Sequence, residues 1–179
     1  MRKCNLFLTA GMLVTFLAHA IMGSQRLFGG NAAPVKALAW ISVGFVAAHA
    51  AVATVLTAQT LRARRRSGAG YFKENKLFWT RRISGFAILI PLVLHLTIFS
   101  TGSADAFRLQ AFTTGRLLSQ ILLVACIALH VLTNIRPALI AFGVKDTKAF
   151  AVDLLLALSV LLLIFAAAFA VYYVRWALN

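Results

Sequence analysis

Residues 71–100 read YFKENKLFWTRRISGFAILIPLVLHLTIFS, and this stretch sets the interpretation of the whole chain. Its first part is basic and aromatic, and its second part is an apolar run that contains Pro91 and His95. An apolar run of this length predicts a membrane-spanning helix. A histidine inside such a run is costly unless other groups satisfy both ring nitrogens, so His95 is a candidate functional residue.

The composition of the 179-residue chain is typical of an integral membrane protein. Hydrophobic residues make up 61% of the chain and charged residues 12%, which is more apolar surface than a soluble domain buries. The net charge of +14 would suggest nucleic acid binding in a soluble protein, but the basic residues lie between the apolar runs, so no nucleic acid partner is expected. Cys4 and Cys126 lie in separate segments without a CxxC or CxxCH motif, which argues against a disulfide and against covalently attached haem.

The apolar runs predict an all-α integral membrane protein with a single transmembrane domain over residues 1–179. The five predicted spans cover about residues 6–22, 37–59, 83–100, 117–135 and 149–174. Pro34 is placed to begin the second helix, and Pro137 is expected to stop the fourth. The first run has a second interpretation, because its basic start and the small residues on both sides of His19 also fit a cleaved secretory signal.

Basic residues predict the orientation of these spans. With the N-terminus inside, the inner segments hold 13 Lys and Arg, and eight of these lie in the loop at residues 60–82. The outer segments hold only five, namely Arg26, Lys36, Arg108, Arg116 and Arg175. Because positively charged loops stay on the cytoplasmic side, the sequence predicts a multi-pass protein of the inner (cytoplasmic) membrane with its C-terminus outside.

The four histidines of the chain each lie in a different one of the first four spans. At ~1.5 Å per residue, His19 and His95 both lie roughly 20 Å from the inner end of their helices. His49 and His130 lie ~18–21 Å from the outer end of theirs, which places them ~9–12 Å from the inner surface. The sequence therefore predicts two levels, with His19 and His95 in the outer half and His49 and His130 in the inner half.

Two histidines at one depth can bind one haem iron from opposite sides. We expect the first four spans to form a bundle around two stacked haem groups. The other interpretation, that each histidine only donates an interhelical hydrogen bond, explains a single residue better than it explains four residues at two matched depths. Two imidazoles leave no open coordination position, so such haems would transfer electrons rather than activate oxygen. Cys126, one turn before His130, is interpreted as a small core residue and not as a ligand.

With these residues in view, the chain resembles the di-haem cytochrome b membrane-anchor subunit of the succinate dehydrogenase/fumarate reductase family. That family has five transmembrane helices with one histidine ligand on each of the first four. The segment ENKLFWTRRISG at residues 74–85, followed by His95 and Leu96, is similar to the family's Arg-Arg-x-Ser-Gly start of a ligand-bearing helix. The resemblance implies a distal haem b on His19 and His95 and a proximal haem b on His49 and His130.

The resemblance also implies partners and a role. An iron–sulfur subunit, bound to a flavoprotein subunit, would dock on the cytoplasmic side, and electrons would pass between it and menaquinone or ubiquinone in the membrane. The chain itself would be an anchor and electron-transfer subunit, with succinate and fumarate handled elsewhere. The chain departs from some relatives in one respect: the first four spans contain no Asp or Glu, and Ala128 stands where one such relative carries a glutamate.

Three residues at the start of the third span are further candidates. Arg81 and Arg82 are suited to bind a haem propionate, and Ser84 could donate to a propionate or to a quinone carbonyl. Alternatively, both arginines only anchor the helix at the lipid headgroups. For the whole chain, the alternatives are a haem b subunit of another quinone-linked dehydrogenase or hydrogenase, or a haem-free membrane anchor or small transporter.

Overall fold

The computed structural model describes residues 2–30, 36–67, 76–99 and 111–178, and these residues form helices without any strand. The helices are α1 (Arg2–Leu27), α2 (Lys36–Ser67), α4 (Lys76–Ala87), α5 (Leu89–Phe99), α6 (Thr114–Ala141) and α7 (Thr147–Ala177). Five helical segments are long and apolar enough to cross a membrane, since α4 and α5 together form one of them. The prediction of an all-helical protein with five membrane-length helices is confirmed.

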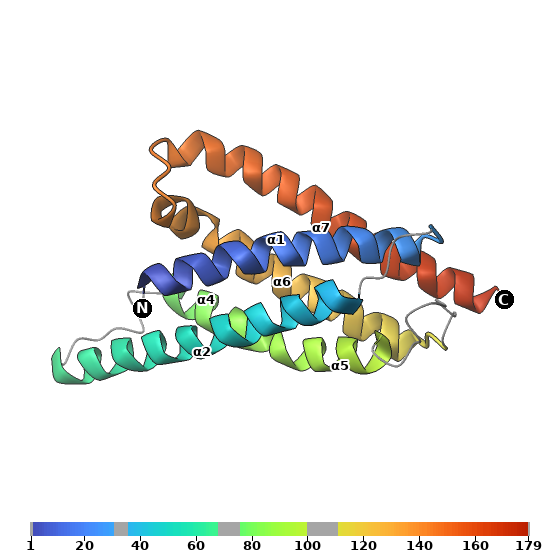
Figure 1. The fold of residues 1–179 in the computed structure, drawn as a ribbon, viewed down its shortest axis with the longest axis horizontal. Helices are drawn as coiled ribbons and strands as arrows, with labels where there is room; N and C mark the ends of the chain where they lie inside the picture. The colour runs from blue at the N-terminus through green and yellow to red at the C-terminus, as the bar shows by residue number, and fades with distance from the viewer. Residues whose placement is uncertain (1, 31–35, 68–75, 100–110, 179) are drawn as a thin grey trace.

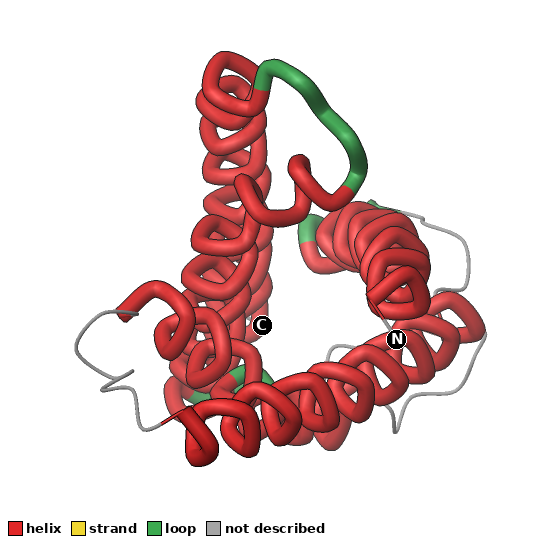
Figure 2. The backbone as a smooth tube through the Cα atoms, turned by 90° about the vertical axis from the view of Figure 1, so that its left-hand side faces the viewer, coloured by secondary structure: helices red, strands yellow, loops and turns green. Residues whose placement is uncertain are grey.

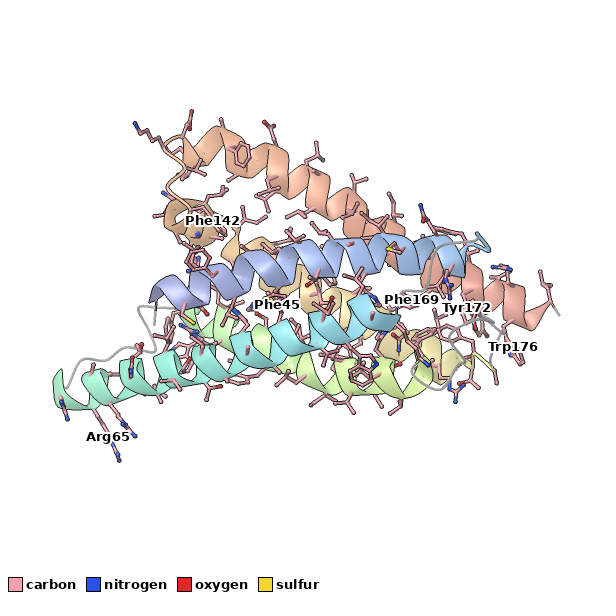
Figure 3. The ribbon with its side chains drawn as sticks, viewed as in Figure 1. Phe45, Arg65, Phe142, Phe169, Tyr172 and Trp176 are labelled. Carbon is pink, nitrogen blue, oxygen red and sulfur yellow. The ribbon has the colours of Figure 1, made fainter. Side chains whose placement is uncertain are left out.

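α2 and α6 extend further than the sequence predicts. α2 continues to Ser67, so Arg62, Arg64, Arg65 and Arg66 are helical rather than part of a loop. Arginine is a good helix former, and residues 60–67 contain no proline or glycine that would end the helix. Figure 3 shows Arg65 near the far end of this extension.

The prediction that Pro137 stops the fourth helix is wrong. α6 passes through Pro137 and continues to Ala141. It ends where Gly143 adopts a left-handed conformation with φ of 82°, and the Val144 amide closes the turn by donating to the Leu139 carbonyl oxygen. The expected role of Pro34 lies outside the described residues.

Pro91 coincides with a break in the third span. Its ring nitrogen has no hydrogen to donate to the carbonyl of Ala87, and α4 ends at that residue. A turn at Ile88 then leads into α5, which begins at Leu89. Pro91 itself is buried, so the bend is packed inside the protein.

The helices form a ring. α1 packs on α2 and α7, α7 packs on α6, and α6 packs on both α4 and α5, while α2 and α4 touch over a short stretch (Figure 2). α1 can approach α2 closely because position 11 is glycine; a Cβ atom there would lie 2.5 Å from the Phe45 ring. α7 is thus part of the ring. The sequence predicts a bundle of the first four spans only and leaves out this fifth helix.

The two ends of the ring are named here by the chain termini. At the N end α1, α4 and α7 begin and α2 and α6 finish, whereas α7 finishes at the C end (Figure 1). A hydrophobic core that includes Phe112, Phe169 and Tyr172 holds the C end together. Phe169 and Tyr172 lie on the C-terminal part of α7, near the end of α1 (Figure 3). This core fixes the position of α7 against α1, α5 and α6.

Candidate functional site

The ring encloses an apolar cavity of about 940 Å³ that all four histidines line. This volume is at the upper end of the ~300–1,000 Å³ typical of ligand pockets. Arg81 and Arg82 line the cavity toward the N end, and Arg26 and Lys36 line it toward the C end. Among the described residues that line it there is no Asp or Glu. The cavity therefore combines apolar walls, four imidazoles and cationic ends.

The histidines lie in two pairs within this cavity. The ring centroids of His19 on α1 and His95 on α5 are 6.1 Å apart, and the ring planes are inclined by 85°. A metal ion held between two imidazole nitrogens lies ~2 Å from each of them, which puts the two centroids ~6 Å apart. His49 on α2 lies near enough to His130 on α6 for its charge to act on that ring, and both rings line the same cavity. The structure thus brings His19 and His95 together, as counting depth along the helices predicts, and places His49 and His130 in the lining of the same cavity.

The ring of His130 is held by the first turns of α4. Its Nδ1 atom lies 3.1 Å from the Arg81 carbonyl oxygen and 3.2 Å from the Ser84 hydroxyl oxygen. Because a carbonyl oxygen only accepts, Nδ1 carries the proton and donates it. Nε2, the other ring nitrogen, then keeps its lone pair, which is the state that a metal ligand requires.

His49 and His95 are held in the same manner. The Thr9 hydroxyl donates to the Asn5 carbonyl oxygen at 2.8 Å, so its oxygen accepts from His49 Nδ1 at 3.4 Å. His95 Nδ1 donates to the Gln120 side-chain oxygen at 2.7 Å. Three of the four histidines therefore present a free Nε2 lone pair.

His19 differs from the other three histidines. Its Nδ1 atom is buried and has no hydrogen-bond partner in the part of the chain that the structure describes. A buried polar nitrogen without a partner destabilises the protein. A ligand bound at the His19 ring would change this free-energy cost. The sequence predicts His19 as a ligand but contains nothing that predicts this difference.

Arg81 has a structural role that the sequence analysis missed. Pro137 has no N–H to donate to the Thr133 carbonyl oxygen four residues earlier. Arg81 Nε donates to this same oxygen at 2.8 Å. The guanidinium of α4 thereby satisfies the carbonyl that the proline leaves open in α6, which lets α6 continue through the proline. The predicted binding of a propionate by Arg81 stays a prediction.

Ser84 and Arg82 lie at the His49–His130 level. The buried Ser84 hydroxyl is engaged by His130 and by the Arg81 carbonyl oxygen, so its present contacts support the histidine rather than a propionate or a quinone. The Arg82 guanidinium carbon lies 5.1 Å from the centre of the Phe78 ring, and its charge acts on both histidines of this level. A positive charge inside an apolar cavity favours a ligand with an anionic group.

The metal-ligating side chains of the described residues do not gather into groups larger than the histidine pairs. No group of three or more His, Cys, Asp or Glu side chains gathers within residues 2–30, 36–67, 76–99 and 111–178. Bis-imidazole haem needs only two such ligands for each iron. Gly85 adds to the fit, because a Cβ atom there would lie 3.0 Å from His130 Cε1 and press on the ring.

Gln120 is the residue of the site that sequence reasoning missed. Its side chain is completely buried and contacts His95 directly. A glutamine inside an apolar span is itself a signal, since burying its amide is costly without partners.

No family model, curated protein or solved structure matches the chain. The fold and site define a class: an all-helical protein with five membrane-length helices and paired histidines inside the ring.

Proposed function

We propose that the chain is a di-haem cytochrome b that transfers electrons within the membrane. One observation carries the proposal: four histidines from four helices line a single apolar cavity, with the ring centroids of His19 and His95 6.1 Å apart. Three of the rings make an interhelical hydrogen bond through Nδ1 and none through Nε2 within the described residues, which leaves Nε2 available to a ligand.

Each pair of histidines would hold one haem iron through its Nε2 atoms. Haem b, when bound, supplies a one-electron couple. The hydrogen bonds at Nδ1 hold the rings of His49, His95 and His130 in a fixed orientation and tautomer, and they raise the basicity of these ligands. With two imidazoles on each iron, no coordination position stays open for oxygen, and the apolar walls exclude water.

The proposed partners follow from the family resemblance. The chain would be the anchor subunit of a succinate:quinone oxidoreductase and would carry electrons between an iron–sulfur subunit and menaquinone or ubiquinone. The N end would face the cytoplasm, because the basic extension of α2 and the start of α4 lie there. The exposed Arg62, Arg65 and Arg66 would contribute to docking the soluble subunits.

Reporter fusions test the proposed orientation. A reporter that is active only in the cytoplasm should be active after Arg66 and inactive after Asn179, because five spans put these positions on opposite sides. Equal activity at both positions would contradict the orientation and the number of spans.

A pyridine haemochrome assay on the purified chain tests the cofactor. We expect two haem b for each chain and a redox titration with two components. A chain that assembles in the membrane without haem would overturn the proposal and favour a haem-free anchor. Two haems without any co-purifying iron–sulfur and flavoprotein subunits would keep the electron-transfer role but reject the succinate dehydrogenase/fumarate reductase complex.

A further inference from the structure

Gln120 is a buried amide near the start of α6, one of the five membrane-length helices. Its exposed fraction is 0%. It belongs to α6, and its side chain meets the His95 ring of α5. A buried amide without partners destabilises a protein by several kcal/mol in an apolar medium, roughly 2–7 kcal/mol. Both polar atoms of this amide therefore need hydrogen-bond partners.

A chain of hydrogen bonds fixes which way the amide points. The Ser119 hydroxyl donates to the Arg116 carbonyl oxygen at 2.7 Å, so its own proton is used. The Ser119 oxygen then accepts from the Gln120 NH₂ group at 3.0 Å. With the NH₂ group directed to Ser119, the amide oxygen is the atom that faces His95 Nδ1 at 2.7 Å.

This amide orientation determines the state of His95. An amide oxygen only accepts, so His95 Nδ1 must carry the proton, and Nε2 keeps the lone pair. Reversing the amide would set its NH₂ group against His95 and would favour the wrong tautomer for binding iron. The tautomer of His95 is thus set through a chain of hydrogen bonds that ends at the Arg116 carbonyl group, four residues before Gln120 on α6.

The His19–His95 level depends on this one anchor. At this level the Nδ1 atom of the partner ring, His19, has no hydrogen bond within the described residues. His130, at the other level, has both a carbonyl and a hydroxyl oxygen within hydrogen-bond distance. Loss of the Gln120 oxygen would therefore leave the His19–His95 level without any hydrogen-bonded ring among its described contacts.

We propose that Gln120 is a positioning residue that holds His95 ready to bind iron and lowers the redox potential of the haem at the His19–His95 level. The inference rests on the proposed function. A hydrogen bond from Nδ1 makes the imidazole a stronger electron donor, and this stabilises the oxidised iron relative to the reduced iron. We expect the effect at one of the two haems, since His95 is the histidine to which Gln120 is hydrogen-bonded among the described contacts.

The test compares two substitutions in the full-length membrane protein. Gln120→Met keeps the size of the side chain but removes the acceptor, and Gln120→Glu keeps an acceptor oxygen. A redox titration should show a higher midpoint potential for the His19–His95 haem in Gln120→Met, with the other haem unchanged. In Gln120→Glu the potential of the same haem should stay or fall. Ser119→Ala, which releases the amide, should raise it by a smaller amount than Gln120→Met.

Two controls separate positioning from packing. Thr97→Val removes an exposed hydroxyl that bonds only to the Leu94 carbonyl oxygen, close to His95 in sequence, and should leave both potentials unchanged. If Gln120→Met loses the His19–His95 haem altogether, Gln120→Glu should restore it. Failure of Gln120→Glu to restore it would show that Gln120 acts through packing and would overturn the inference.

A measurement without haem separates this inference from the proposed function. In chain prepared from haem-deficient cells, ¹⁵N NMR of the histidine rings should show the Nδ1–H tautomer for His95, and Gln120→Met should lose this preference. Unchanged potentials and an unchanged tautomer in Gln120→Met would overturn the inference while both haems stay bound. A wild-type chain that never binds haem would overturn the proposed function, whatever the tautomer of His95.

Discussion

The two histidine levels hold their rings by different means. At the His49–His130 level, the anchors are a main-chain carbonyl oxygen and the hydroxyl oxygens of Thr9 and Ser84. At the His19–His95 level, one ring is anchored by the side chain of Gln120 and the other has no anchor within the described residues. The first level therefore has an anchor on each ring, and one of these anchors is a backbone group, whereas the second level depends on a single side chain.

The surroundings of the two levels also differ. The charge of Arg82 acts on both His49 and His130. His95 instead lies against aromatic rings, with centroid distances of 5.0 Å to Phe99 and 6.3 Å to Phe169. A nearby positive charge favours the reduced form of an iron, so we expect the haem at the His49–His130 level to have the higher potential. The same ligand pair can thus give two different potentials in one cavity.

The largest effect should come from removing a histidine. His19→Ala and His95→Ala should each abolish the same haem, and His49→Ala and His130→Ala should each abolish the other. Haemochrome content should fall from two haems to one in every variant, and redox titration identifies the missing component. Loss of the same component in His19→Ala and His49→Ala would break the assignment of the two levels.

A smaller, one-sided effect should come from Gly85→Ala. The added Cβ atom would lie 3.0 Å from His130 Cε1, so the ring would have to move by a few tenths of an ångström. Overpacking of this kind costs about 1–3 kcal/mol, and we expect weaker haem retention at the His49–His130 level alone.

Gly44→Ala is the matched control for this change. Position 44 lies within α2 and has no heavy atom within 4 Å of an added Cβ. This variant should keep both haems and gain up to about 1 kcal/mol of helix stability. If Gly85→Ala and Gly44→Ala retained haem equally, the close contact at His130 would have no role in the site.

Substituting Arg82 should shift the redox potential of one haem without loss of haem. Arg82→Gln removes the positive charge and should lower the potential of the His49–His130 haem by the equivalent of about 1–2 kcal/mol. Arg82→Lys keeps the charge but loses the planar fork, so its shift should be smaller. Equal shifts of both haems in a redox titration would mean that Arg82 does not distinguish the two levels.

The smallest effects should come from the hydroxyl anchors. Thr9→Val removes the hydroxyl oxygen that accepts from His49, whereas Ser84→Ala leaves His130 with the Arg81 carbonyl oxygen. We expect Thr9→Val to weaken haem binding by about 0.5–1.5 kcal/mol and Ser84→Ala to weaken it less. Haem loss to apomyoglobin gives both rates, and a greater loss in Ser84→Ala would show that the carbonyl oxygen is not a sufficient anchor.

The helices and the depths of the histidines could be predicted from the sequence because both are one-dimensional quantities. An apolar run has a length, and a constant rise per residue converts position into depth. This is why counting along the chain places His19 with His95 and His49 with His130 before any packing is known. Haem ligation by these pairs stays a prediction until it is measured.

The helix ends and the anchors depend on contacts between distant residues. Pro137 predicts a stop, yet α6 continues, because Arg81 donates to the carbonyl oxygen that the proline leaves open. The donor lies 52 residues from this oxygen in the chain. No local pattern contains such information.

The amino-acid sequence alone is thus enough to predict five apolar helices of membrane length and two depths for the four histidines. Three features appear only once the helices are packed: α7 closes the ring, Gln120 meets His95, and His19 has no such anchor within the described residues. The physical reason is that depth follows from the rise along one helix, whereas a contact across an interface depends on how two helices are rotated against each other.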